Sequence, residues 1–290
     1  MLRTFVTVAR LGSFSAAAVE LGYTQAAISQ QIAALESDLK VPLLNRRPVS
    51  PTEAGARLLE HAEALLLRLD AARADVTRMT QPPAAALIVG ASPLAAGSPG
   101  LARALAAVRR RRPRLDVTVR VRPRAHVLTA VARGEFDVGL ADGLTAWGDP
   151  LPEFSSLTAV RVSQAGVAIV LPGDHPLAGR AGLRLSDLAD ARWIEASDVS
   201  SPLSEIRRLA GVDGFRSAFG YDGSDVTSLV QLAAAGHGLT LLPETALPPT
   251  GITAVRVASP RVVHRVELVH GTLREGSPAA ELAALLAPRG

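Results

Sequence analysis

Apolar positions recur with helical spacing through the first forty residues and predict three short helices. The first covers about residues 2–10, and the second covers about residues 15–21 and ends at Gly22, which tolerates a positive φ. Thr24 is a suitable N-cap for the third helix, which continues to Leu39. One face of the third helix is an apolar stripe, formed by Ile28, Ile32, Leu35 and Leu39. Its opposite face is small or polar and carries Gln25, Ser29, Gln30, Ala33 and Glu36.

Two short helices joined by a tight turn, the second with a thin polar face, suit insertion into a DNA major groove. An ordinary helical hairpin with a solvated polar face fits the same residues, because such hairpins are common. The segment after Leu39 bears on the choice. Residues 43–50 predict a short two-stranded ribbon with Arg46 and Arg47 at its tip. These arginines are either solvated loop charges or contacts to DNA phosphates or a minor groove. Beside a helix-turn-helix, DNA contact is favoured.

A long helix is predicted from Thr52 to about Thr80. Its apolar positions alternate between spacings of four and three, at Leu58, Ala62, Leu65, Leu69, Ala72, Val76 and Met79. That heptad seam is typical of a two-stranded coiled coil and predicts a dimer. An amphipathic helix lying on its own domain would not need so regular a period. Gln81-Pro82-Pro83 stops the helix and is predicted to act as a hinge.

From Ala84 onward, strands alternate with helices. Strands are predicted at residues 86–91, 115–121 and 136–140, and two separate strands at 157–162 and 166–171. Such alternation predicts right-handed βαβ units and a parallel sheet. The chain is predicted to cross twice between two α/β subdomains, one formed by residues 84–158 and 263–290 and the other by 159–262. The fold class is therefore α+β multidomain: a winged helix-turn-helix at residues 1–57, a linker helix and hinge at 58–83, and a two-subdomain α/β domain at 84–290.

Composition narrows the function classes. The chain has no cysteine, which excludes disulfides, Cys-ligated metals and thiol catalysis. Only one of its 31 basic residues is lysine, and the net charge is +4, so a single copy would bind DNA modestly and a dimer would bind better. No run of 18 apolar residues is present, and Arg10 interrupts any signal-peptide core, so a cytoplasmic protein without a membrane span is expected.

Candidate ligand-binding residues follow the predicted strands, where α/β folds bind small molecules. They are Ser92, Pro93, Asp142, Ser197, Ser224 and Thr227. Each Ser or Thr alone could equally be a cap or turn residue, but together they favour a cleft. Trp147 and Phe154 either wall that cleft or fill a subdomain core. The six histidines show no metal spacing, and no nucleophile or paired-carboxylate arrangement stands out, so neither a cofactor nor enzymatic activity is expected. The arginines of residues 109–114 are interpreted as a solvated face rather than a second nucleic-acid site.

Residues 2–60 resemble the N-terminal domain of LysR-type transcriptional regulators. The pattern is met by Phe5, Ser13-Phe14-Ser15, Ala17-Ala18 and Leu21, then Thr24-Gln25, Ser29 and Ile32-Ala33-Ala34-Leu35-Glu36, and finally Leu43-Leu44-Asn45-Arg46 and Thr52-Glu53-Ala54-Gly55. Residues 172–179 and 235–244 resemble recurrent segments of the same family's effector domain, so the resemblance implies that residues 84–290 form an effector domain of periplasmic-binding-protein type. The sequence departs from the pattern at Ala26, Gln30 and Lys40, and its short wing carries Pro48 and Pro51.

The resemblance implies a cytoplasmic regulator that binds an interrupted palindrome in double-stranded DNA as a homodimer or homotetramer. DNA contacts are assigned to Thr24, Gln25, Ala26, Ser29, Gln30, Arg46 and Arg47. Dimer contacts are assigned to Leu58, Ala62, Leu65, Leu69, Ala72 and Val76. A small effector, such as a carboxylate or similar polar metabolite, would shift the subdomains and change DNA bending or contact with RNA polymerase. The rival classes are a solute-binding protein and an enzyme on an α/β scaffold.

Overall fold

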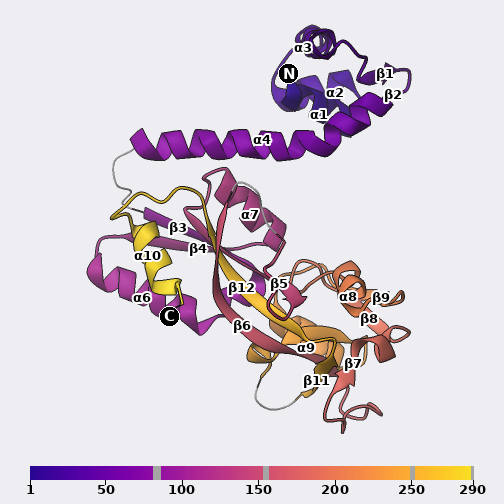
Figure 1. The fold of residues 1–290 in the computed structure, drawn as a ribbon, viewed down its shortest axis with the longest axis vertical. Coiled ribbons are helices and arrows are strands. Elements are labelled where there is room, and N and C mark those ends of the chain that lie inside the picture. Colours follow the sequence, from indigo (N-terminus) through magenta and orange to yellow (C-terminus); the bar gives the residue numbers. More distant parts are fainter. Residues whose placement is uncertain (81–85, 153–156, 249–251, 289–290) are drawn as a thin grey trace. The chain divides into compact units, whose positions relative to one another are not determined.

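The computed structural model describes residues 1–80, 86–152, 157–248 and 252–288. The chain forms two compact units, residues 1–73 and 74–290, which are described separately (Figure 1). The predicted hinge at Gln81-Pro82-Pro83 and the aromatic residue Phe154 lie outside the described residues.

The N-terminal unit is a winged helix-turn-helix. Its elements are α1 (Leu2–Leu11), α2 (Phe14–Leu21), α3 (Gln25–Leu39), β1 (Leu44–Arg46), β2 (Val49–Pro51) and the first part of α4 (Glu53–Thr80). Thr24 caps α3 by accepting a hydrogen bond from the Ala27 N–H at 3.2 Å, and Gly22 adopts φ 69° in the turn before it. The turn chemistry therefore fixes the angle at which α3 leaves α2.

The core of this unit joins all of its elements. Its fully buried members come from α1, α2, α3 and the wing, namely Phe5, Val8, Ala17, Ala18, Ile28, Ile32, Leu43 and Leu44. Leu39 does not belong to it and is 45% exposed, so the predicted apolar stripe of α3 is too long. Leu39 is the last helical residue, and the chain turns away at Lys40, whose φ is 55°. Leu43 and Leu44 complete the core instead.

The C-terminal unit contains one long mixed sheet, in the order β4-β3-β5-β12-β6-β11-β7, with β10 also paired to β6. In subdomain I, β3 lies parallel to β4 and β5, and β12 lies antiparallel to β5 and β6. Helices α6 and α10 pack with the sheet in one hydrophobic cluster, and α7 packs with the sheet in another. The elements are β3 (Ala86–Ala91), α5 (Pro93–Ala96), α6 (Pro99–Arg111), β4 (Asp116–Val121), α7 (Arg124–Ala132), β5 (Val138–Ala146), β6 (Thr158–Leu171), β12 (Val262–His270) and α10 (Pro278–Leu286).

Subdomain II is built on the far half of β6 and centres on the fully buried Trp193, whose Nε1–H donates to the Leu188 carbonyl at 2.9 Å. A separate pair, β8-β9, lies beside α8 and α9 (Figure 1). The elements are β7 (Leu183–Arg184), η1 (Leu185–Leu188), β8 (Arg192–Glu195), α8 (Leu203–Ala210), β9 (Arg216–Gly220), α9 (Val226–Ala234), β10 (Thr240–Pro243), η2 (Glu244–Ala246) and β11 (Thr253–Ser259).

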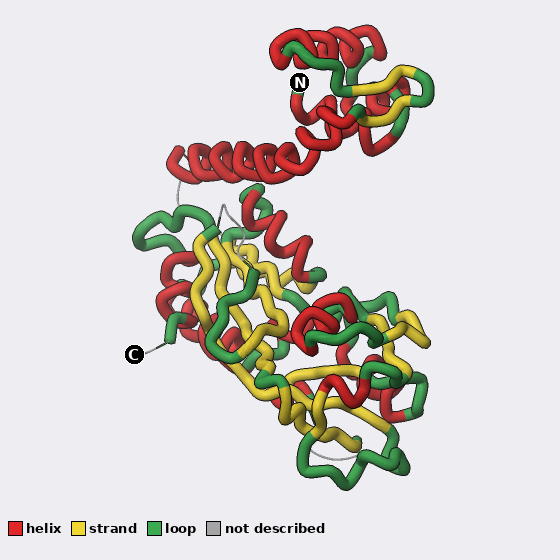
Figure 2. Tube along the Cα trace, turned by 45° about the vertical axis from the view of Figure 1, so that its right-hand side comes forward, coloured by secondary structure: helices red, strands yellow, loops and turns green. Residues whose placement is uncertain are grey.

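The predicted fold class is confirmed, but the sheet is mixed rather than parallel, because β12 pairs antiparallel with β5 and β6, and β10 and β11 pair antiparallel with β6. Three further details differ. The two strands expected at residues 157–162 and 166–171 are one continuous strand, β6. It pairs with β12 up to Gly166 and with β10 and β11 from Val167, so the change of subdomain occurs inside a strand (Figure 2). Strand β5 runs on to Ala146, so Asp142 lies inside a strand rather than in the loop after it. Strands β7 and β9 were not predicted.

Candidate nucleic-acid interface and effector cavities

The exposed face of α3 carries the residues assigned to base contact. Thr24, Gln25, Ala26 and Gln30 are exposed, and Ser29 is half-buried at the edge of the same face. The Ser15 hydroxyl donates a hydrogen bond to Gln25 Oε1 at 3.3 Å and restricts the position of the Gln25 side chain. Tyr23, 55% exposed in the turn before α3, is a further candidate that the sequence pattern did not single out. Within the N-terminal unit, this face of α3 is therefore exposed and available for contact with DNA.

The wing is fixed to α3 by a single carboxylate. Glu36 Oε1 accepts from the Leu43 and Leu44 backbone N–H groups at 2.8 and 3.2 Å, and its Oε2 accepts from Arg46 at 3.1 Å. The Arg46 guanidinium also stacks over the Phe14 ring, 5.1 Å from its centroid. Glu36 is therefore a structural residue rather than part of the solvated polar face. Arg47 is exposed and makes no ion pair with the residues that the structure describes, so it is the freer of the two wing arginines.

The seam of α4 is divided between two environments. Leu58 packs on the winged-helix core, and Ala62 is fully buried. Leu65, Leu69 and Val76 are 51%, 46% and 63% exposed, and Ala72 is also exposed. Arg3 of α1 pairs with Asp70 at 2.6 Å and holds this part of α4 on its own unit. The exposed residues form an apolar stripe with heptad spacing, as a coiled-coil partner would require.

The C-terminal unit contains a cavity of about 320 Å³ between the start of α7 and the loop before α8. We call it the α7–α8 cavity. Four of the six residues expected to bind an effector line it: Ser92, Pro93, Asp142 and Ser197. The two subdomains meet at its wall, where the Leu144 N–H donates to the Ser201 hydroxyl oxygen at 3.1 Å. The volume suits a small metabolite.

Arg124 is a lining residue of this cavity that sequence reasoning missed. Its Nε is buried and has no hydrogen-bond partner among the described residues, while one Nη donates to the Pro152 carbonyl at 3.3 Å. Arg124 thus brings a guanidinium, which has hydrogen-bond donors only, to a cavity that Ser92 and Ser197 also line. The signal was available in the sequence, because Arg124 follows β4 and opens a helix, at the carboxyl end of a parallel strand.

A buried hydrogen-bonded network lies behind the α7–α8 cavity. The Ser92 hydroxyl donates to Asp142 Oδ1, and the other carboxylate oxygen, Oδ2, lies 2.7 Å from His264 Nε2. All three residues are at most 7% exposed. Although Ser, Asp and His occur together, the carboxylate separates the hydroxyl from the imidazole, so no base activates the serine. The network is a polar connection between β3, β5 and β12.

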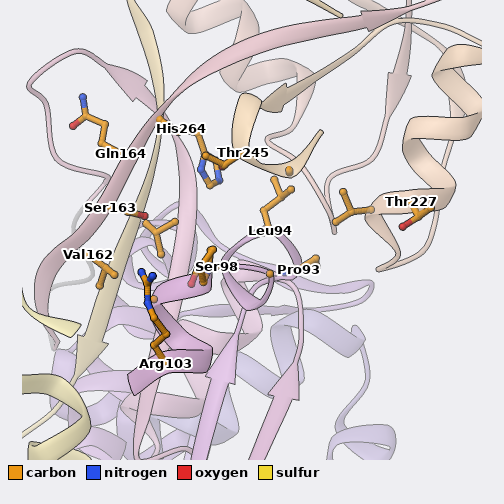
Figure 3. Close-up of a pocket in the computed structure, with 17 residues that line it drawn as sticks. Pro93, Leu94, Ser98, Arg103, Val162, Ser163, Gln164, Thr227, Thr245 and His264 are labelled. Carbon is orange, nitrogen blue, oxygen red and sulfur yellow. The ribbon is translucent and has the colours of Figure 1, made fainter. Parts of the chain in front are cut away.

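A second cavity, of about 510 Å³, lies on the other side of this network. We call it the α6–α9 cavity, because α6 and α9 contribute residues from their first turns (Figure 3). Thr227 and Pro93 line it, as does His264. Ser224 is among the lining residues of neither cavity. The expected effector residues therefore fall around two cavities rather than one.

The contacts also place Trp147 and the arginines at the end of α6. Trp147 lines neither cavity and fills no core, because it is 54% exposed with the Arg261 guanidinium 3.8 Å from its ring centroid. Arg111 and Arg112 pair with Glu281 of α10 at 3.0 and 2.9 Å. Among the described residues, no cluster of three potential metal ligands occurs, and no helix is long and apolar enough to cross a membrane.

Together, a winged helix-turn-helix, a long helix with an exposed heptad stripe and a two-subdomain domain with ligand-sized cavities define a DNA-binding regulator that senses a small molecule. Comparison with known families agrees. Residues 1–56 match the model of the bacterial regulatory helix-turn-helix protein, lysR family, and residues 80–286 match that of the LysR substrate binding domain. The chain belongs to the LysR family of transcriptional regulators, and it is not an enzyme.

Individual relatives and solved structures match this chain over most of its length. A probable hydrogen peroxide-inducible genes activator of Mycobacterium avium is 30% identical over 276 residues, covering 92% of this chain and 86% of the relative. A crystal structure of full-length CbnR complexed with its target DNA is 22% identical and has a TM-score of 0.55, covering 98% of this chain and 97% of that one. A cysteine mutant of OxyR from Corynebacterium glutamicum is 28% identical with a TM-score of 0.50, covering 98% and 90%.

Proposed function

We propose that this LysR-family regulator binds its operator as a dimer through α3 and the wing, and that its effector is a small polar carboxylate held in the α7–α8 cavity. The observation that carries the effector assignment is the half-buried Arg124, which lines that cavity and whose Nε has no hydrogen-bond partner among the described residues. A carboxylate oxygen supplies the acceptor, and charge assistance makes that bond strong.

The other charged groups of the cavity refine the ligand class. Asp198 and Glu205 also line it, and Glu205 is paired with Arg208 at 2.7 Å. Carboxylates accept hydrogen bonds and donate none, so they favour a ligand with hydroxyl or amino donors away from its carboxylate. A hydroxy acid or an amino acid has both features. An apolar acid would leave Asp198 without a donor.

The relatives that respond to peroxide suggest a second candidate, a peroxide sensor, but the chain has no cysteine. Peroxide sensing by thiol oxidation needs a thiolate that passes to the sulfenic acid or a disulfide. This chain must therefore respond by another chemistry. Reversible ligand binding in a cavity is the alternative that the two subdomains support.

The DNA assignment rests on the exposed face of α3 and on Arg47. The solved complex of CbnR with its target DNA supports the same use of the N-terminal unit, as a likeness of fold. The DNA-contact set is Thr24, Gln25, Ala26, Ser29, Gln30, Arg46 and Arg47, with Arg46 acting through its fixed position beside Glu36. A cytoplasmic location follows from this function.

The experiment that tests the DNA assignment is a gel-shift titration of the full-length protein on its own upstream region. Replacing Gln25 and Ser29 together by Ala should raise the dissociation constant about tenfold or more, because each lost base contact costs about 1–3 kcal/mol. Ser37→Ala, in the last turn of the same helix, is the matched control and should leave affinity unchanged. An unaltered double variant would refute the assigned face.

The effector assignment has its own test. Thermal unfolding of the full-length protein is followed with a panel of amino and hydroxy acids, each paired with its amide. Acids that raise the unfolding temperature should lose the effect in Arg124→Gln and in the amide form. If an acid still raises the unfolding temperature of Arg124→Gln, the effector binds at another site. That result would leave the DNA assignment unchanged.

A further inference from the structure

Two consecutive residues of α1 connect the helix that carries the proposed DNA contacts to the long helix α4. The Thr4 hydroxyl donates to Oε1 of Gln31 in α3, and the Arg3 guanidinium donates to Oδ1 of Asp70 in α4 at 2.6 Å. Thr4 is 3% exposed, so its bond to α3 is sheltered from water. Figure 1 shows α1 between α3 and α4. Helix α1 therefore contacts both of the helices whose relative orientation matters for DNA binding.

The ion pair holds α4 at a point far from the hydrophobic core of the N-terminal unit. That core reaches α4 at Leu58 and Leu59, and Ala62 is buried one turn later. At 1.5 Å per residue, Asp70 lies about 16 Å farther along the helix than Leu59. With that lever arm, a displacement of about 1 Å at Asp70 tilts α4 by about 4°. Contact with Arg3 therefore restricts the angle of α4 more tightly than the core contacts do.

The surroundings of Asp70 favour a defined contact with α1. The Asp70 side chain is 14% exposed, so its attraction to Arg3 is screened less than that of a fully exposed pair. Arg73 Nη1 also lies 3.9 Å from Asp70 Oδ1, but Arg73 is one turn away on the same helix and so joins no second element. Arg3 is 48% exposed, and pairs of this kind contribute little to folding stability. Loss of the pair should therefore alter the angle between helices more than the unfolding temperature.

We propose that α1 fixes the angle between α3 and α4, and that Arg3 and Asp70 are positioning residues that set the spacing of the operator half-sites. The proposal rests on the proposed function, in which α3 reads DNA and the α4 stripe joins two copies. In such a dimer, a tilt of α3 against α4 changes the separation of the two α3 helices. Each base pair added between half-sites moves them about 3.4 Å apart and rotates one against the other by about 34°. A dimer with a fixed angle therefore discriminates between spacings.

The test is a gel-shift titration of the full-length protein on its own upstream region, with half-sites located by footprinting. Two derivatives have one base pair added or removed between the half-sites. The wild type should bind the native spacing roughly tenfold or more tightly than either derivative. Arg3→Gln and Asp70→Asn should each reduce that ratio about threefold or more, with little change in unfolding temperature. These two substitutions change the net charge in opposite directions, so a purely electrostatic effect on DNA affinity would have opposite signs in the two variants.

Two further variants complete the design. Arg3→Lys keeps the positive charge and should retain most of the wild-type ratio. Arg57→Gln is the matched control, because Arg57 pairs with Glu60 on its own helix, and it should leave the ratio unchanged.

A wild-type ratio in both Arg3→Gln and Asp70→Asn would overturn the inference and leave the proposed function standing. An equal loss of affinity at every spacing in Arg3→Gln alone would make Arg3 a phosphate contact, which also overturns the inference. A wild type without any preference for spacing would overturn the proposed dimer and this inference with it.

Discussion

Replacing Leu65 and Leu69 by Ala should weaken the dimer and leave α4 intact. Both side chains are about half exposed within their own protomer, at 51% and 46%. Ala has the highest helix propensity, so the double variant keeps the helix. What is lost is the apolar surface that a partner helix would cover.

The expected loss of dimerisation free energy follows from the exposed half of each leucine side chain. Fully burying a leucine side chain contributes about 1.5–3 kcal/mol, so the remaining half is worth about 1 kcal/mol. A symmetric dimer buries four such side chains, two from each protomer, and so loses about 3–4 kcal/mol in the double variant. That is a rise of about two to three powers of ten in the dissociation constant.

Sedimentation velocity over a concentration series of full-length protein measures this constant. Glu63→Ala, exposed on the same helix but outside the seam, is the matched control and should dimerise like the wild type. A change of less than about fivefold in the double variant would show that the α4 stripe does not hold the dimer together, and the interface would have to be sought on another surface.

Three further substitutions test the packing described above. Glu36→Gln keeps an oxygen that accepts from the Leu43 and Leu44 N–H groups but replaces the carboxylate that pairs with Arg46 by an amide. Operator affinity should therefore fall several-fold, while the unfolding temperature changes little. Equal affinity in gel shifts would contradict the role of Glu36 in holding the wing. Gly55→Ala would place a Cβ 2.0 Å from the Leu43 carbonyl oxygen, so the unfolding temperature should fall and DNA binding with it. Glu281→Gln should cost about 1 kcal/mol at neutral pH, because the hydrogen bond from Arg112 holds the pKa of Glu281 below its ordinary 4.5. A lowered pKa gives stability that is present above 4.5 and lost as the pH falls through the folded value, so the two proteins should converge in acid; a difference that persists there in denaturant titrations would refute this account.

The helical part of the N-terminal unit was predictable because its signals are local. Thr24 caps α3 as expected, and Ile28 and Ile32 are buried as their spacing required. Glu36 was misassigned to the solvated face because its partners, the backbone of residues 43 and 44, come from another element. Sequence periodicity reports which face of a helix is polar, but it does not report which polar groups meet a partner.

The effector-type domain was predictable in architecture and less so in its site. Alternating strands and helices indicated an α/β domain, and Ser92 and Ser197, which follow strands, line a cavity; their part in effector binding stays a prediction. Arg124 was overlooked although it follows β4 and opens a helix, whereas His264 lies inside a strand and has no local pattern that indicates a buried polar contact. Their roles depend on burial and on distant partners such as Asp142, which are properties of the folded chain.

The continuity of β6 determines what kind of motion the sensor can make. A strand of 14 residues that exchanges β12 for β10 and β11 without a break has no loop at which to swing freely. Any rotation of one subdomain against the other must twist a hydrogen-bonded ladder, and the restoring force grows with the angle. Such a joint is elastic. If a ligand rotates one subdomain against the other, the rotation would be a small, graded change of twist instead of a switch between an open and a closed position.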